Sequence, residues 1–325
     1  MPSISETLYP PARTLSTSSA ALSLCGPMGS SQQLLGAGGG RLLAWLRRCT
    51  ANRFAAAGLG AVLTAFIQSS SAVTSLAIAL VDRRVLGFTA ALGVLLGANV
   101  GTTATAWLVS LKLTLLGPVA LSAGALVSAI APDRWKPAGK VLFYFGFVLF
   151  ALDLIGDAMT PLRSEPAVLD VLAYADSPWL GVLAGVVITA VLQSSSVTTG
   201  LAVVLVQQQV LPPVAAIYLV VGSNVGTTVT GLLASASMGT LARRVAVINT
   251  GFKLAGAALF APVLVVFAHA VVQHAPTPDA SVAWAHLVFN LVSASLFLVA
   301  LPLYSGRLER WALQADAPAA PLAAR

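Results

Sequence analysis

Charged residues are scarce in this chain: they make up 9% of its 325 residues, whereas hydrophobic residues make up 57%. An average soluble domain carries about 25% charged residues, so the scarcity excludes a soluble globular protein. Apolar runs of about 20 residues recur along the chain, and each is long enough to cross a membrane as a helix. The alternating pattern of a membrane β-barrel is absent, so the sequence predicts an all-α integral membrane protein.

Other absences narrow the function. The chain has two cysteines, Cys25 and Cys49, and three histidines without metal-ligand spacing, which argues against a disulfide framework or a metal site. It contains no GxSxG, P-loop or HExxH motif, so we expect no enzymatic activity and no resident cofactor. The net charge of +7 comes from basic residues in short loops, which is typical of the cytoplasmic side of an inner-membrane protein and does not indicate nucleic-acid binding.

What the sequence does contain is a duplication. The stretch "TAFIQSSSAVTSLAIALV" at residues 64 to 81 returns as "TAVLQSSSVTTGLAVVLV" at residues 189 to 206. At an offset of 125 residues, the positions from 60 to 108 show 25 identities in 49 with those from 185 to 233. A second pair of motifs, "GANVGTT" at 97 to 103 and "GSNVGTT" at 222 to 228, follows in register. Internal duplication in a membrane protein indicates a transporter built from two related halves.

The composition predicts four regions. Residues 1–39 are rich in Ser, Pro and Gly and are expected to form a disordered tail. A first half at 40–139 begins with a basic amphipathic segment at 41–53 and contains a hairpin at 55–81. The second half, at 140–305, contains a hairpin at 179–206 and the final helix, and a cytoplasmic tail follows at 306–325. We expect about six membrane spans, at 88–109, 114–131, 140–160, 214–236, 245–267 and 282–304.

The arginines predict how the two QSSS regions enter the membrane. Arg47, Arg48 and Arg53 precede the first region, and Arg83 and Arg84 follow it, so both of its ends should be cytoplasmic. The first QSSS then lies at the tip of a re-entrant hairpin. Three spans separate the two hairpins, and because three is odd, the second hairpin should enter from the opposite face. We therefore expect an inverted repeat with both tips near the midplane and with both termini cytoplasmic.

A QSSS break in an apolar helix can hold a ligand. Serine hydroxyls donate to an anion or coordinate a cation, and the positive end of the helix that begins after each QSSS favours an oxyanion. The carbonyls that end the preceding helix suit a cation such as sodium. The alternative is ordinary packing of small residues, with Ser and Thr bonding back to carbonyls, which the duplication in register makes less favoured. Asp153, Asp157, Lys253 and Asn290 are weaker candidates that either function at depth or pack and snorkel.

Duplicated QSSS hairpins, each followed by a G[AS]NVGTT span, resemble the type II sodium/phosphate cotransporter family over about residues 40 to 305. The resemblance implies a secondary transporter that couples inorganic phosphate to sodium ions across the inner membrane. It implies phosphate binding by Gln68, Ser69, Ser70, Ser71, Gln193, Ser194, Ser195 and Ser196. It implies sodium binding or support from Thr74, Asn99, Thr102, Thr103, Thr199, Asn224, Thr227 and Thr228.

Two departures from the family pattern and three alternatives stay open. The apolar segment at 140–160 before the second hairpin has no apolar counterpart before the first, so either a helix has been lost or the N-terminal region is misrepresented. The C-terminal helical domain of many bacterial relatives is not found in the last 20 or so residues. The alternatives are a phosphate exporter, a carrier of another oxyanion such as arsenate, and a non-transporting membrane sensor or partner protein. The oligomeric state and the ion stoichiometry stay open as well.

Overall fold

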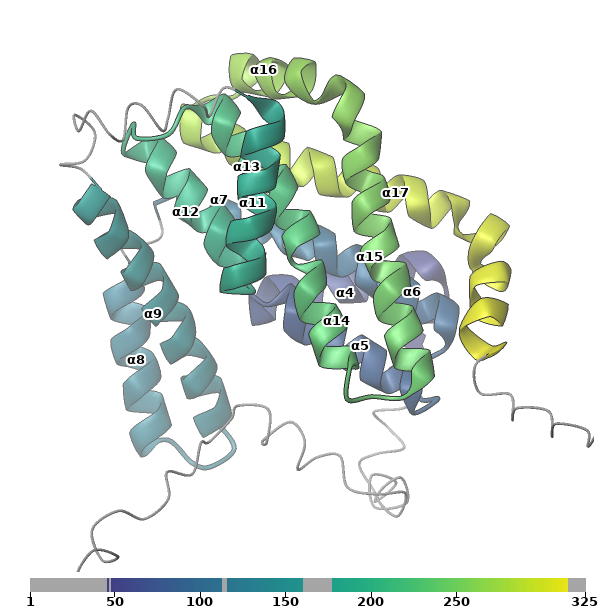
Figure 1. The fold of residues 1–325 in the computed structure, drawn as a ribbon. Coiled ribbons are helices and arrows are strands. Elements are labelled where there is room, and N and C mark those ends of the chain that lie inside the picture. Colours follow the sequence, from purple (N-terminus) through teal and green to yellow (C-terminus); the bar gives the residue numbers. More distant parts are fainter. Residues whose placement is uncertain (1–45, 47, 113–115, 160–176, 315–325) are drawn as a thin grey trace, which may run out of the picture. The chain divides into compact units, whose positions relative to one another are not determined.

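The structure is a computed structural model in which residues 46, 48–112, 116–159 and 177–314 are described. This part of the chain is helical and contains no strand. The chain divides into a unit at Met1–Arg48, which lies almost entirely outside the described residues, and a unit at Cys49–Arg325, to which all helices below belong (Figure 1). The predicted disordered tail and about half of the predicted amphipathic segment therefore lie outside the described residues.

The sequence repeat is also a repeat of helices. The first half contains α4 (Arg53–Ile67), α5 (Ser70–Asp82), α6 (Phe88–Gly101) and α7 (Thr103–Ser110). The second half contains α11 (Pro178–Leu192), α12 (Ser195–Gln207), α13 (Pro213–Gly226) and α14 (Thr228–Ser235). Every boundary in the second set lies 125 residues after its counterpart in the first. Both sequences therefore direct the chain into the same series of helices and breaks.

The other helices are α8 (Gly117–Ile130), α9 (Lys136–Met159), α15 (Thr240–Phe260), α16 (Leu264–His274) and α17 (Pro278–Leu313), with a 3₁₀ turn, η3 (Ala261–Val263), between α15 and α16. The helices α8 and α9 lie side by side (Figure 1). Thr277 caps the start of α17 by accepting a hydrogen bond from the N–H of Ala280. Pro302 lies inside α17, whose ribbon bends in its C-terminal part (Figure 1).

Five segments of the described chain are long and apolar enough to span a membrane. They are Phe88–Ser110, Lys136–Ile155, Pro213–Ser235, Thr240–His274 and Pro278–Leu313. The prediction of an all-helical membrane protein is confirmed, and five of the six expected spans have a counterpart among these segments. The sixth expected segment is 114–131; residues 114 and 115 lie outside the described residues, and the helix described there, α8, has 14 residues. At 1.5 Å per residue it is about 21 Å long, which is short of a ~30 Å hydrocarbon core.

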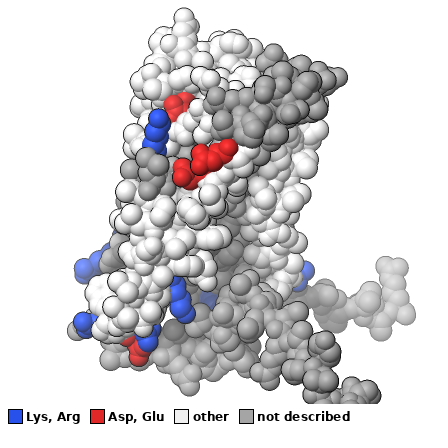
Figure 2. Space-filling model, turned by 90° about the vertical axis from the view of Figure 1, so that its left-hand side faces the viewer, with Lys and Arg blue, Asp and Glu red and all other residues white. Residues whose placement is uncertain are grey.

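Large apolar side chains cover the outside of these helices. Phe66 is 81% exposed, Val191 75%, Ile130 74% and Leu303 80%. Figure 2 shows a face that is largely uncharged, with a few charged side chains in its upper part and more, mainly basic, at its lower end. Apolar surface of this extent is unfavourable in water and favourable against lipid tails, so the chain is a multi-pass membrane protein.

Close helix pairs fix the frame of each half. In α6, a Cβ atom added to Gly97 would lie 1.8 Å from the carbonyl oxygen of Ala57 in α4. In α13, a Cβ atom added to Gly222 would lie 1.9 Å from the carbonyl oxygen of Val182 in α11. Only glycine permits this backbone contact. The helices α4 and α11, which lead to the two QSSS breaks, are therefore held directly against the backbones of α6 and α13.

The two halves interlock through their shorter helices. The helix α5 packs against α14 of the second half, and α12 packs against α7 of the first half. Side chains of Ala106 and Val109 from α7 share a core with Ala202 and Val203 from α12. Each helix that begins at a QSSS break is thus supported by the other half.

Candidate functional site

Each QSSS sequence forms a two-residue break between two short helices. Gln68 ends α4 in the left-handed conformation, with φ 57° and ψ 26°, and Gln193 ends α11 with φ 56° and ψ 23°. Ser69 and Ser194 are extended and cap α5 and α12. A left-handed residue other than glycine costs about 1–2 kcal/mol. This cost occurs at the same place in both halves, and we call the two QSSS segments, each a break with the first two residues of the next helix, the first tip (68–71) and the second tip (193–196).

Some polar groups of the tips form hydrogen bonds with the backbone at the helix ends. The hydroxyl of Ser69 accepts the N–H of Ala72 at 3.2 Å, and that of Ser194 accepts the N–H of Val197 at 3.3 Å. The Gln68 amide donates to the carbonyl oxygen of Ala65. Four further hydroxyls make no hydrogen bond within the described residues, those of Ser70, Ser71, Ser195 and Ser196. These hydroxyls, at the positive ends of two helices, can donate to an anion.

Two threonines that sequence reasoning missed contact the tips. Thr105 in α7 donates its hydroxyl to Oε1 of Gln68 at 2.7 Å. Thr230 in α14, which is the equivalent residue 125 positions later, donates to the backbone carbonyl oxygen of Gln193 at 3.4 Å. Both lie just beyond the GxNVGTT motifs, and their identity at the repeat offset was the signal that could have identified them.

Three threonines of the GxNVGTT motifs donate to backbone carbonyls three or four residues before them in the chain. Thr102 donates to the carbonyl of Ala98 at 2.9 Å, Thr103 to that of Val100 at 2.7 Å, and Thr227 to that of Ser223 at 3.0 Å. These are the bonds that the packing alternative describes. The remaining threonines of the predicted sodium set are buried, and their hydroxyls make no hydrogen bond in the described part of the chain: Thr74, Thr199 and Thr228.

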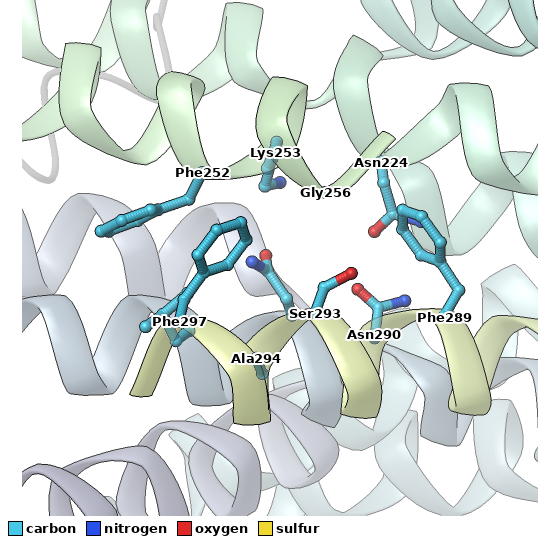
Figure 3. Close-up of a pocket in the computed structure, with 11 residues that line it drawn as sticks. Asn224, Phe252, Lys253, Gly256, Phe289, Asn290, Ser293, Ala294 and Phe297 are labelled. Atoms are coloured by element: carbon cyan, nitrogen blue, oxygen red, sulfur yellow. The ribbon is translucent and has the colours of Figure 1, made fainter. Parts of the chain in front are cut away.

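The two asparagines of the GxNVGTT motifs come together at one polar cavity. Asn99 from α6 and Asn224 from α13 line it, together with Lys253 from α15 and Asn290 and Ser293 from α17 (Figure 3). The Nζ atom of Lys253 donates to Oγ1 of Thr227 at 3.1 Å. The cavity measures about 20 Å³, which is room for one water molecule. Its remaining lining is made by apolar residues and one glycine: Leu96, Phe252, Gly256, Phe289, Ala294 and Phe297.

Other candidates are not brought together. Within the described residues no hydrogen bond joins the first tip to the second. Asp153 and Asp157 lie in α9, where Asp153 is half-buried and Asp157 is exposed, and neither lines the polar cavity. Each tip is instead connected to the cavity along its own half. Thr105 contacts the first tip six residues after Asn99, and Thr230 contacts the second tip six residues after Asn224.

The two copies of a helix–break–helix unit place this chain in the class of multi-pass membrane proteins that are built from internal repeats. The chain belongs to the Na+/Pi-cotransporter family, whose model matches residues 22–157 and 167–301. The two matched stretches contain one tip each. The first begins at residue 22, within the segment predicted to be a tail.

Individual relatives agree with this assignment. YqeW, an uncharacterized protein of Bacillus subtilis, is 33% identical over 73% of this chain and 78% of its own length. YjbB of Salmonella typhimurium, whose name proposes the export of inorganic phosphate, is 29% identical over 78% of this chain and 47% of its own. Human sodium-dependent phosphate transport protein 2C is 37% identical over 43% of this chain and 25% of its own. The chain thus spans about half the length of YjbB, and no solved structure matches it.

Proposed function

We propose that this protein carries inorganic phosphate across the inner membrane in a sodium-coupled cycle. The observation that carries the proposal is the pair of tips, in which a left-handed glutamine and a capping serine recur with nearly identical geometry. Membership of the Na+/Pi-cotransporter family supports the choice of substrate and ion. The names of the human relatives, which are sodium-dependent phosphate transport proteins, support it as well.

Phosphate would be bound at the tips. Its oxygens would accept hydrogen bonds from the serine hydroxyls and from the free N–H groups at the starts of α5 and α12. The proposed phosphate ligands are Gln68, Ser69, Ser70, Ser71, Gln193, Ser194, Ser195 and Ser196. No lysine or arginine occurs in either tip, so a substrate with about −1.5 to −2 charges needs positive charge from elsewhere. Sodium ions held by oxygens of the GxNVGTT motifs would supply it.

The tips would lie near the membrane midplane at the ends of two re-entrant hairpins. With 15 residues, α4 and α11 are about 22 Å long, and with 13 residues, α5 and α12 are about 20 Å long. Each can pass the centre of a ~30 Å core but cannot cross it, which supports a chain that enters and returns. We infer opposite directions of approach, as in an inverted repeat, which requires that α8 cross the membrane between the segments Phe88–Ser110 and Lys136–Ile155 and so make the number of spans between the hairpins odd.

The charges of α9 support the proposed orientation. This helix begins near the basic residues Lys136 and Lys140 and carries Asp153 and Asp157 toward its other end. Figure 2 agrees, with Lys and Arg side chains mainly at the lower end of that face and acidic ones mainly at the upper. The positive-inside rule then makes the start of α9 cytoplasmic. Following the chain forward from there makes the C-terminus cytoplasmic, and following it back makes the N-terminus cytoplasmic when α8 is counted as a span.

Uptake of labelled phosphate into proteoliposomes tests the function. An inward sodium gradient should drive uptake, and a potassium gradient of the same size should not. Ser69→Ala combined with Ser194→Ala should reduce uptake at least 10-fold, because both tips lose a hydroxyl. The exposed Ser237, replaced by alanine, is the control and should leave uptake unchanged. Sodium-driven uptake that is unaffected by the double substitution would disprove the assignment of phosphate to the tips.

Export is a second candidate, supported by the names of the YjbB relatives. A carrier can run in either direction, so the question is which gradient drives it. Vesicles loaded with labelled phosphate, with sodium applied inside or outside, separate import from export. Competition by arsenate in the same assay measures how well the site distinguishes oxyanions. Phosphate flux without any effect of sodium would favour export by another mechanism.

A further inference from the structure

Lys253 is a buried positive charge in the middle of a candidate span. Its side chain is 9% exposed, and it belongs to the apolar segment Thr240–His274. None of the residues that line the polar cavity is acidic, and within the described chain no carboxylate contacts Lys253. An ammonium group at such depth is unfavourable unless oxygen atoms or an anion replace its water.

One hydroxyl oxygen contacts the ammonium, and further amide and hydroxyl groups line the cavity that Lys253 also lines. Oγ1 of Thr227 accepts its hydrogen bond at 3.1 Å. The amides of Asn99, Asn224 and Asn290 line the same cavity (Figure 3). Ser293 is 9% exposed, and its hydroxyl has no hydrogen-bond partner in the described residues. Amide and hydroxyl oxygens without a carboxylate form a site for a hard monovalent cation, and here a side chain reaches into it.

The lysine interrupts a pattern shared by α15 and α17. At an offset of 37 residues, five positions of α15 correspond in residue type to five positions of α17. Two carry phenylalanine in both helices, two carry a polar residue in both, and one carries a small residue in both. They are Asn249, Phe252, Lys253, Gly256 and Phe260 in α15, and His286, Phe289, Asn290, Ser293 and Phe297 in α17. The two helices pack on each other, and in this pattern an asparagine stands where α15 has the lysine. Asparagine is therefore the neutral residue that α17 already carries at the position corresponding to Lys253.

The first half has no equivalent side chain. The residue 125 positions before Lys253 is Ser128 in α8, a helix that packs on α9. Thr102, the counterpart of Thr227, bonds to Ala98 of its own helix and receives no hydrogen bond from another helix in the described residues. The two GxNVGTT motifs therefore differ in one respect: a cation on a side chain is bonded to the second motif.

We propose that the ammonium of Lys253 is a tethered cation that takes the place of one sodium ion at the GSNVGTT motif. The second half then contributes a fixed positive charge to the neutralisation of phosphate, and sodium binds only to the first half of this pair of motifs. The proposal rests on the proposed function for the identity of the ion. It predicts that removal of the lysine opens a sodium site.

Equilibrium binding of ²²Na⁺ to the purified full chain in detergent tests this proposal. Lys253→Asn should bind one more sodium ion per chain than the unmodified protein. Thr227→Val added to Lys253→Asn should abolish the extra ion, because the hydroxyl that holds the ammonium would be lost. Lys253→Arg should bind no extra ion, since the charge stays. Lys140→Asn, which removes an exposed lysine, is the matched control and should also bind none.

Two results would overturn the proposal. One is an unchanged sodium count in a Lys253→Asn protein that melts at the temperature of the unmodified chain. The other is a lower count, which would mean that the lysine supports sodium binding and does not replace it. If Lys253→Asn does not fold, the same count on Lys253→Gln decides. Because binding is read without transport, failure of phosphate uptake in the unmodified protein would refute the proposed function and leave this measurement intact.

Discussion

Replacement of Thr105 by valine should weaken phosphate binding by loosening the first tip. Valine has nearly the same shape as threonine, so the change removes one hydroxyl and little packing. The lost bond, from Thr105 to Oε1 of Gln68, is 2.7 Å long and is a neutral hydrogen bond. Such bonds contribute about 0.5–1.5 kcal/mol. Gln68 is half-buried, so water replaces part of the loss. We expect phosphate affinity to fall about 2- to 10-fold.

The same change in the second half should have a smaller effect. The bond from Thr230 to the carbonyl oxygen of Gln193 measures 3.4 Å, which is at the long end for a hydroxyl donor. Gln193 is also exposed, so water satisfies its carbonyl readily. Thr230→Val should therefore lower phosphate affinity by less than about 2-fold. The order of the two effects follows from the geometry alone.

The assay is the phosphate concentration that gives half-maximal sodium-driven uptake, supported by equilibrium binding of labelled phosphate. A double-mutant cycle with Gln68→Met isolates the Thr105–Gln68 interaction. If the bond positions the tip, Thr105→Val should cost little once Gln68 has lost its amide. Equal effects of Thr105→Val and Thr230→Val, or full additivity in the cycle, would refute the reasoning.

Two further predictions concern stability. Gly97→Ala should prevent a stable fold in detergent, because its Cβ atom would meet the Ala57 backbone. As a control, Gly58→Ala should keep or raise the melting temperature, because a Cβ atom there would have nothing within 4 Å. A stable Gly97→Ala protein would contradict the close packing of α4 on α6. Val73→Thr should raise the free energy of unfolding by about 1 kcal/mol, because it gives the buried hydroxyl of Thr64 a hydrogen-bond partner that it lacks within the described residues. The second half already has this pair, since Thr189 bonds to Thr198, the counterpart of Val73, at 2.9 Å. No rise in thermal stability would contradict the prediction.

Much of the helical frame could be predicted from the sequence. Apolar length predicted the membrane class, and the repeat predicted that the two halves would share their breaks. The breaks fall at QSSS because the segment consists of four consecutive polar residues. Three of them are serines, whose side chains bond to nearby backbone groups and favour helix caps over helix interiors. The inverted orientation, the re-entrant path and the ligands of the tips stay predictions.

The contacts between distant segments could not be predicted. The left-handed glutamines required backbone geometry, and the roles of Thr105 and Thr230 required knowing which helix faces each tip. Lys253 had no repeat counterpart that marked it, and only tertiary packing brings it to Thr227. Composition does not reveal where a helix starts or ends: within the segment expected at 114–131 the described helix runs from Gly117 to Ile130. The last helix was underestimated for the same reason, since α17 continues past 304 to Leu313.

The interlocking of the halves gives a physical reason why the two tips should act together. The helix α7 contributes Thr105 to the first tip and also packs against α12, which begins at the second tip. The helix α14 contributes Thr230 to the second tip and packs against α5, which begins at the first. A shift of either tip therefore changes a contact surface of the other. Close packing transmits such a shift because cores resist small voids. Substitutions at Thr105 should accordingly change the phosphate affinity of a protein whose second tip is intact, and they should do so without altering its helix content.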